Sequence, residues 1–83
     1  MKVLINTQAT LKSMDLRMDT RARERYLDEA HTTMVERLAE IGAICYRDGE
    51  CLRVEKKDGR GLLAACRAAA AKACGAYGNV RVM

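Results

Sequence analysis

Few side chains in this sequence have the chemistry of catalytic nucleophiles or bases. The chain contains a single histidine, His31, a single serine, Ser13, and four cysteines. Nucleophilic catalysis needs a nucleophile and a base within hydrogen-bond reach, so a cysteine–His31 pair is the one arrangement that stays open. The carboxylates of the central segment lie among arginines and form no isolated pair. The sequence therefore predicts a protein that is not an enzyme and has no cofactor.

The four cysteines follow no zinc-binding pattern. Their spacings are Cys45-x5-Cys51 and Cys66-x7-Cys74, without a C-x2-C pair or a second histidine to complete a tetrahedral set. Free thiols buried as small apolar groups are the expectation, with redox activity as the alternative. We therefore predict no metal site and a reducing, cytoplasmic environment.

Nothing in the sequence predicts targeting to a membrane. Lys2 is followed by only a short apolar run, which is unlike a signal peptide. No stretch approaches the roughly 18 apolar residues needed to cross a bilayer. We expect a cytoplasmic protein without a membrane partner.

The charge is basic and uneven along the chain. The formal net charge is +4, and residues 62–83 carry three basic side chains without an acidic one. Such a balance favours anionic partners, either nucleic acid or an acidic protein face. Because the only aromatic residues are three tyrosines, each core layer must be thin. A homodimer and a small monomer are both open.

The apolar periodicity predicts six elements in one domain spanning residues 1–83. A short β-branched run predicts a strand at Lys2–Asn6, and a 3.6-residue stripe predicts a helix from Thr20 to Ile41. Asp19 or Thr20 is expected to cap this helix, and Gly42 to end it. A hairpin of strands 43–47 and 50–57 follows. A helix over Leu62–Cys74 and a strand over Asn79–Met83 complete the chain.

This β-α-β-β-α-β order predicts an α+β ferredoxin-like sandwich. Its antiparallel sheet would have strand order 4-1-3-2, with two helices on one face. Residues 7–19 form a longer connection than this fold needs. Within it, residues 14–19 alternate apolar and polar, which leaves an extra strand open.

The dipeptide Asp48-Gly49 predicts a tight type I′ turn between the hairpin strands. Pairing Arg47 with Glu50 would place Cys45 opposite Leu52. In that register Cys45 and Cys51 point to opposite faces, which disfavours a disulfide between them. The following run 58–61 has neither the spacing nor the lysine of a P-loop and predicts a plain turn.

Eight basic residues are the predicted contacts to a partner. They lie around the hairpin and its exit, in the second helix and in the last strand: Arg47, Arg53, Lys56, Lys57, Arg60, Arg67, Lys72 and Arg81. Tyr46 is the one aromatic residue expected on the open face of the sheet. RNA-recognition modules stack bases on aromatics of the two central strands, which these strands lack.

Residues 14–40 resemble the opening of ribbon-helix-helix DNA-binding repressors. The strand MDLRM precedes a charged helix, as in that family. The resemblance implies a dimeric ribbon in which Asp15 and Arg17 face the bases while Met14, Leu16 and Met18 are buried. The family has two helices separated by a turn, whereas this helical pattern is unbroken.

A second resemblance concerns Arg47–Gly75, an Asp-Gly hairpin followed by an alanine-rich helix. It resembles small phage-encoded accessory proteins, including anti-CRISPR inhibitors. That resemblance implies stoichiometric inhibition of a host defence nucleoprotein by surface contacts. We therefore predict a non-enzymatic inhibitor or adaptor that binds a protein or nucleoprotein complex through a basic surface. The alternative is a direct DNA- or RNA-binding protein, either as a ribbon dimer or through the open sheet face.

Overall fold

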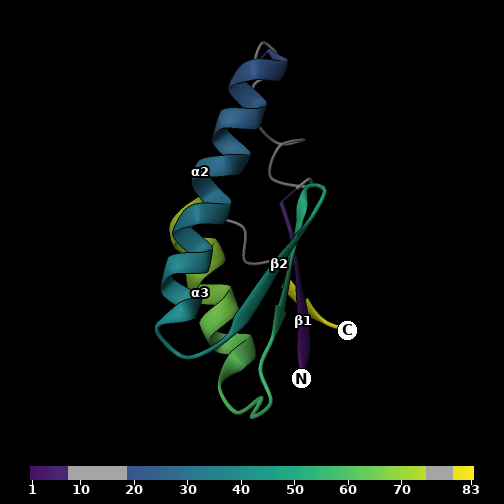
Figure 1. Cartoon of the computed structure of the whole chain (residues 1–83), viewed down its shortest axis with the longest axis vertical. Coiled ribbons are helices and arrows are strands. Elements are labelled where there is room, and N and C mark those ends of the chain that lie inside the picture. The colour runs from purple at the N-terminus through teal and green to yellow at the C-terminus, as the bar shows by residue number, and fades with distance from the viewer. Residues whose placement is uncertain (8–18, 75–79) are drawn as a thin grey trace.

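A four-stranded antiparallel sheet carries both helices on one face, so the protein belongs to the α+β class (Figure 1). The computed structural model describes residues 1–7, 19–74 and 80–83. The strand order is β2-β3-β1-β4. Residues 14–19, for which the sequence left an extra strand open, lie almost wholly outside the described residues. The elements are β1 (Lys2–Asn6), α2 (Thr20–Ala39), β2 (Ile44–Asp48), β3 (Cys51–Glu55), α3 (Leu62–Cys74) and β4 (Val80–Val82).

The predicted caps of α2 are confirmed by their hydrogen bonds, although the helix ends at Ala39 and not at the predicted Ile41. The Asp19 carboxylate accepts a hydrogen bond from the backbone N–H of Ala22 at 2.7 Å. At the other end, Gly42 has φ +80° and donates to the carbonyl of Ala39, while Ala43 donates to that of Leu38. These two bonds form a Schellman motif, which needs a left-handed residue that glycine adopts without steric cost.

The hairpin turn differs from the prediction by two residues of register. Asp48 pairs with Cys51 and Arg47 pairs with Leu52, so the loop residues are Gly49 and Glu50. Among described non-glycine residues none has positive φ, whereas Gly49 has φ +60°. A type I′ turn needs positive φ at both central positions, but a type II′ turn needs it only at the first. The predicted pairing of Arg47 with Glu50 is therefore wrong.

The predicted faces of the hairpin are nevertheless correct. Side chains alternate with period two, so a shift of two residues keeps every side chain on its face. Cys45 pairs with Val54 on the side of the helices, and Tyr46 pairs with Arg53 on the other side. Cys45 and Cys51 thus point to opposite faces, and both are free thiols.

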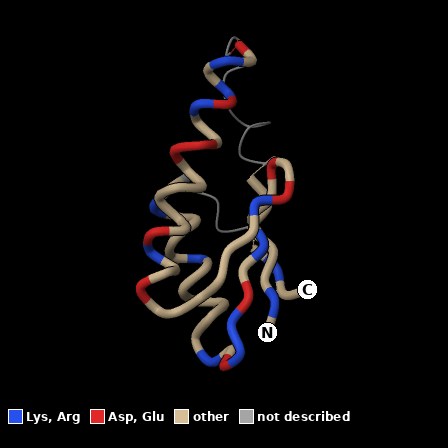
Figure 2. The backbone as a smooth tube through the Cα atoms, in the orientation of Figure 1, with Lys and Arg blue, Asp and Glu red and all other residues tan. Residues whose placement is uncertain are grey.

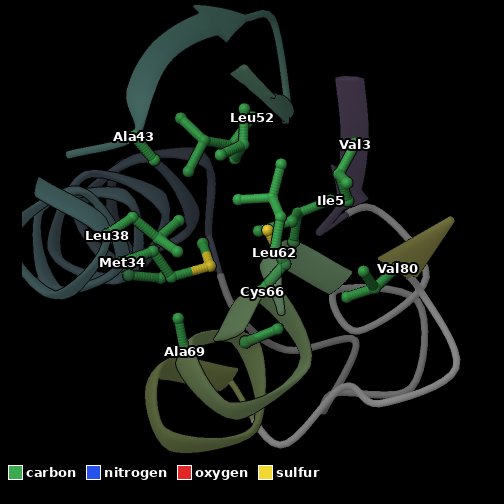
Figure 3. Packing of buried hydrophobic residues seen from close by; sticks show 13 residues of the cluster. Val3, Ile5, Met34, Leu38, Ala43, Leu52, Leu62, Cys66, Ala69 and Val80 are labelled. Atoms are coloured by element: carbon green, nitrogen blue, oxygen red, sulfur yellow. The ribbon is translucent and has the colours of Figure 1, made fainter. Parts of the chain in front are cut away.

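The core lies between the helices and the inner face of the sheet (Figure 3). Small side chains on α3 let its backbone approach its neighbours closely, as the alanine-rich sequence predicts. The cluster combines aliphatic side chains from β1, β3 and β4 with a stripe from each helix and with Ala43 before β2: Val3, Ile5, Ala30, Met34, Leu38, Ala43, Leu52, Val54, Leu62, Cys66, Ala69, Ala70 and Val80. No described helix is long and apolar enough to cross a membrane.

Candidate functional site

The eight predicted contact residues lie on three separate parts of the surface. Lys56, Lys57 and Arg60 follow β3 at one end of the molecule, where the tube of Figure 2 shows basic residues close to the N-terminus. Arg53 and Arg81 lie on the open face of the sheet. The remaining three are on the helical side or at its margin: Arg47, Arg67 and Lys72. The eight residues therefore do not form one continuous patch.

Backbone pairing between the first residues and the hairpin exit builds the first of these surfaces. Met1 donates from its amino group to the Lys56 carbonyl at 2.9 Å, and Lys56 N–H donates back to the Met1 carbonyl at 3.1 Å. These two bonds continue the antiparallel pairing of β1 with β3, in which Lys2 lies opposite Glu55. Lys2, Lys56, Lys57 and Arg60 thus belong to one region, which we call the basic end.

A hollow of about 410 Å³ opens at the basic end. Its lining combines apolar and cationic groups: Met1, Lys2, Gly42, Ile44, Glu55, Lys56 and Lys57. Ile44 is 57% exposed and Met1 is 47% exposed, so both present aliphatic surface to solvent. The Lys2 ammonium lies 3.7 Å from the Glu55 carboxylate, which partly neutralises one side of the hollow.

The turn that leads from the basic end into α3 is held by its own side chains. The Asp58 carboxylate accepts a hydrogen bond from the backbone N–H of Arg60 at 3.1 Å. That N–H is therefore engaged by a carboxylate of the same turn, which agrees with the plain turn predicted for residues 58–61. A Cβ at Gly59 would lie 2.5 Å from Met1 Cβ, so this glycine permits the close approach of Met1.

A row of side chains crosses the open face of the sheet on all four strands. Tyr46 on β2 pairs with Arg53 on β3, which pairs with Leu4 on β1, which pairs with Arg81 on β4. Tyr46 is half exposed, while Leu4 is only 9% exposed. Arg53 is also engaged by Asp48, whose carboxylate lies 3.0 Å from its guanidinium. In the described part of the chain neither helix lies on this face.

A second hollow, of about 400 Å³, lies between α2 and the hairpin. Arg47 on β2 forms an ion pair with Asp28 on α2 at its margin. Its remaining lining is mixed: His31, Thr32, Val35, Glu36, Cys45 and Leu52. The predicted contact residue Arg47 is therefore engaged within the protein.

His31 is buried beside this hollow, although the sequence placed it only at the edge of the helical stripe. It is 4% exposed, and within the described part of the chain neither imidazole nitrogen has a hydrogen-bond partner. Desolvation by burial, followed by the positive charge of Arg47, lowers the pKa of His31. The nearby Glu50 carbonyl and the Asp28 carboxylate act in the opposite direction. His31 is thus held as a neutral imidazole.

The described cysteines differ in their surroundings. Cys66 is fully buried in the core, and burial, with a smaller contribution from Cys45, raises the pKa of its thiol to about 11. Burial also raises the pKa of the Cys45 thiol. A raised pKa disfavours the reactive thiolate. Within residues 1–7, 19–74 and 80–83, no three His, Cys, Asp or Glu side chains come together as metal ligands.

Arg67 and Lys72 are exposed on α3 and do not line the hollow at the basic end. Lys72 borders a smaller hollow between α3 and α2, which Tyr26 and Glu29 also line. These two predicted contacts therefore belong to the helical face.

Lys2 and Ile44 line the hollow at the basic end, but neither was among the partner contacts predicted from the sequence. Lys2 joins the basic end because β1 pairs with β3, and Ile44 joins it because β2 pairs with β3 at Glu55. The predicted strand order contained the signal for Lys2, since it placed the first and third strands side by side. No comparable signal indicated that an isoleucine would be left exposed.

The chain was compared with known proteins at three levels. No protein-family model matches it, no curated protein matches it, and no solved structure matches it.

Proposed function

We propose that this protein is a non-enzymatic binding protein, an inhibitor or adaptor that engages a protein or nucleoprotein complex through its basic surface. The observation that carries the proposal is an open hollow that Lys2, Lys56 and Lys57 line together with the exposed aliphatic side chains of Met1 and Ile44, with Arg60 in the turn that follows. Clustered charge of one sign speeds the encounter with an oppositely charged partner. Exposed apolar side chains at the same place add area that binding can bury.

The proposal also covers the fold, the cellular compartment and the target. A sheet of order β2-β3-β1-β4 with both helices on one face supports a ferredoxin-like sandwich. Three free thiols among the described residues support a reducing, cytoplasmic setting. The resemblance of the hairpin and alanine-rich helix to anti-CRISPR inhibitors supports a host defence complex as the target.

A pull-down with matched charge variants tests the proposal. Charge reversal of Lys56, Lys57 and Arg60 to Glu changes the net charge by −6, from +4 to −2. Reversal of Arg21, Arg23 and Arg25 on the exposed start of α2 gives the same net charge and serves as the control. Each protein is tagged and incubated with host lysate, with and without nuclease, and retained proteins are identified by mass spectrometry.

The proposal expects a defined protein complex that the wild type and the control retain after nuclease treatment. The triple variant at the basic end should lose it, with a melting temperature close to that of the wild type. Equal retention by the triple variant would remove the basic end from the interface. Retention of nucleic acid alone, lost after nuclease, would overturn the proposal in favour of direct nucleic-acid binding.

The second candidate function is direct DNA or RNA binding through the open sheet face. The row of Tyr46, Arg53, Leu4 and Arg81 favours it, because an aromatic ring stacks on bases and flanking arginines contact phosphates. The residues of the alternative ribbon, 14–18, lie outside the described residues. Affinity for single-stranded oligonucleotides should then fall steeply with salt and fall further in Tyr46→Ala. An affinity that changes neither with salt concentration nor in Tyr46→Ala would contradict this candidate function.

A further inference from the structure

The hollow at the basic end is lined by side chains of two chemical kinds. Met1 and Ile44, each about half exposed, contribute aliphatic surface. Lys2, Lys56 and Lys57 contribute ammonium groups, and Glu55 is the one acidic side chain among the described residues that line the hollow. With three positive charges and one negative charge, these side chains have a net charge of +2.

Three features hold the lining of the hollow in place. The exchange of hydrogen bonds between Met1 and Lys56 fixes the first residue against the hairpin exit. The pairing of Ile44 with Glu55 fixes the start of β2 beside it. Gly42 ends α2 with a left-handed turn, and an added Cβ there would meet no atom within 4 Å. The hollow is therefore open next to Gly42.

We propose that this hollow binds a short acidic segment of the protein partner. An aliphatic side chain of that segment lies against Met1 and Ile44, and flanking carboxylates pair with the ammonium groups of Lys2, Lys56 and Lys57. This inference rests on the proposed function and names the chemistry of its partner. Burying an aliphatic side chain stabilises the complex, while the charges orient it.

The composition of the lining favours a peptide over a nucleic acid or a lipid surface. None of the described residues that line the hollow is aromatic, so bases have no ring on which to stack. The Glu55 carboxylate repels a continuous run of phosphates but leaves room for spaced carboxylates. Lysine is a compact charge on a flexible stem, and it suits single carboxylates that approach from several directions.

A peptide titration followed by NMR provides the direct test. The probe is a pentapeptide with two acidic residues on each side of a central leucine, added to the isotope-labelled full chain up to about 1 mM. Amide signals of Lys2, Gly42, Ile44 and Lys56 should shift. Replacing the central leucine by serine should weaken binding by about 10-fold or more, because the aliphatic contact is lost.

Two pairs of variants separate the charged and apolar contributions. Lys56→Glu with Lys57→Glu should reduce peptide affinity by about 10-fold or more, whereas Arg21→Glu with Arg25→Glu, which changes net charge equally, should leave it unchanged. Ile44→Ser should weaken binding of the leucine peptide. Val82→Ser, at a comparably exposed aliphatic residue on the other edge strand, should not.

Three results would overturn the inference. They are the absence of any shift at these amides up to the highest peptide concentration, equal binding of the leucine and serine peptides, and stronger shifts with an oligothymidine or with phosphatidylserine vesicles. If the lysate complex is still lost in the triple variant while the peptide fails, only this inference is wrong. If the triple variant also retains the lysate complex as the wild type does, the proposed function is wrong as well.

Discussion

Arg47 on β2 and Asp28 on α2 form an ion pair that joins the hairpin to the long helix beside the buried His31. The pair is largely solvent-exposed, with side-chain exposures of 48% and 62%. Exposed ion pairs contribute little because water screens them and both side chains lose freedom. The pair matters locally, because the Arg47 charge helps to lower the pKa of His31, whose imidazole has no hydrogen-bond partner among the described residues.

Stability should fall as the pH drops from 7.5 to 5. The pKa of His31 is lowered in the folded protein, so the unfolded chain takes up a proton near pH 6.5 while the folded chain stays neutral. The neutral imidazole therefore makes its whole contribution to the free energy of unfolding at pH values above the pKa of His31 in the unfolded chain. This contribution is lost as the pH falls towards the pKa of His31 in the folded protein. Urea unfolding at several pH values measures this change. His31→Leu should flatten the profile, and an unchanged slope in that variant would contradict the assignment.

Removing the Arg47–Asp28 pair should have only a small effect. In a double-mutant cycle with Arg47→Gln and Asp28→Asn, we expect a coupling energy below about 1 kcal/mol. Urea unfolding of the four proteins at two salt concentrations gives this value, which salt should reduce further. A coupling of several kcal/mol would show that the pair is a structural anchor of the hairpin.

The Cys66 thiol should react very slowly in the native protein. It is fully buried, and its pKa is raised to about 11, so little thiolate is present at neutral pH. Pulsed alkylation followed by peptide mass spectrometry should label the partly exposed Cys51 before Cys66. Unfolding in denaturant should make the two rates similar. Rapid native labelling of Cys66 would contradict its position in the core.

Gly42→Ala should destabilise the protein through backbone strain alone. Its φ of +80° is unfavourable for a residue with a Cβ, and no atom lies close enough to clash with one. The expected loss is about 1 kcal/mol in the free energy of unfolding. Gly42→Asn should cost less, because asparagine tolerates the left-handed conformation better. Equal stability of all three proteins in urea would contradict the Schellman motif.

Leu52 and Ile44 provide a matched pair of aliphatic truncations on neighbouring strands. Leu52→Ala removes a side chain that is 1% exposed and should cost about 2–5 kcal/mol. Ile44→Ala removes exposed surface and should change stability by about 0.5 kcal/mol or less. Thermal or urea unfolding measures both. A large loss of stability in Ile44→Ala would show that this side chain supports the core, which would weaken its assignment to a binding surface.

Local sequence chemistry determined much of the secondary structure. The alanine-rich stripe defined α3 with the bounds Leu62–Cys74, and Asp19 and Gly42 marked the ends of the preceding helix. Each of these features depends on neighbouring residues and their caps, so a single sequence contains it. The faces of the hairpin were also predictable, because period-two alternation survives an even shift of register.

Tertiary structure decided the turn, the histidine and the shape of the candidate site. In the hairpin turn only Gly49 has positive φ, and this moved the loop by one residue and the register by two. His31 is buried only because the hairpin packs against its helix, a contact that helical periodicity does not contain. Lys2 and Lys56 are 54 positions apart, and only the pairing of β1 with β3 brings them to one end. The sequence by itself determined local conformation and side-chain periodicity, whereas contacts between distant segments required the packed chain.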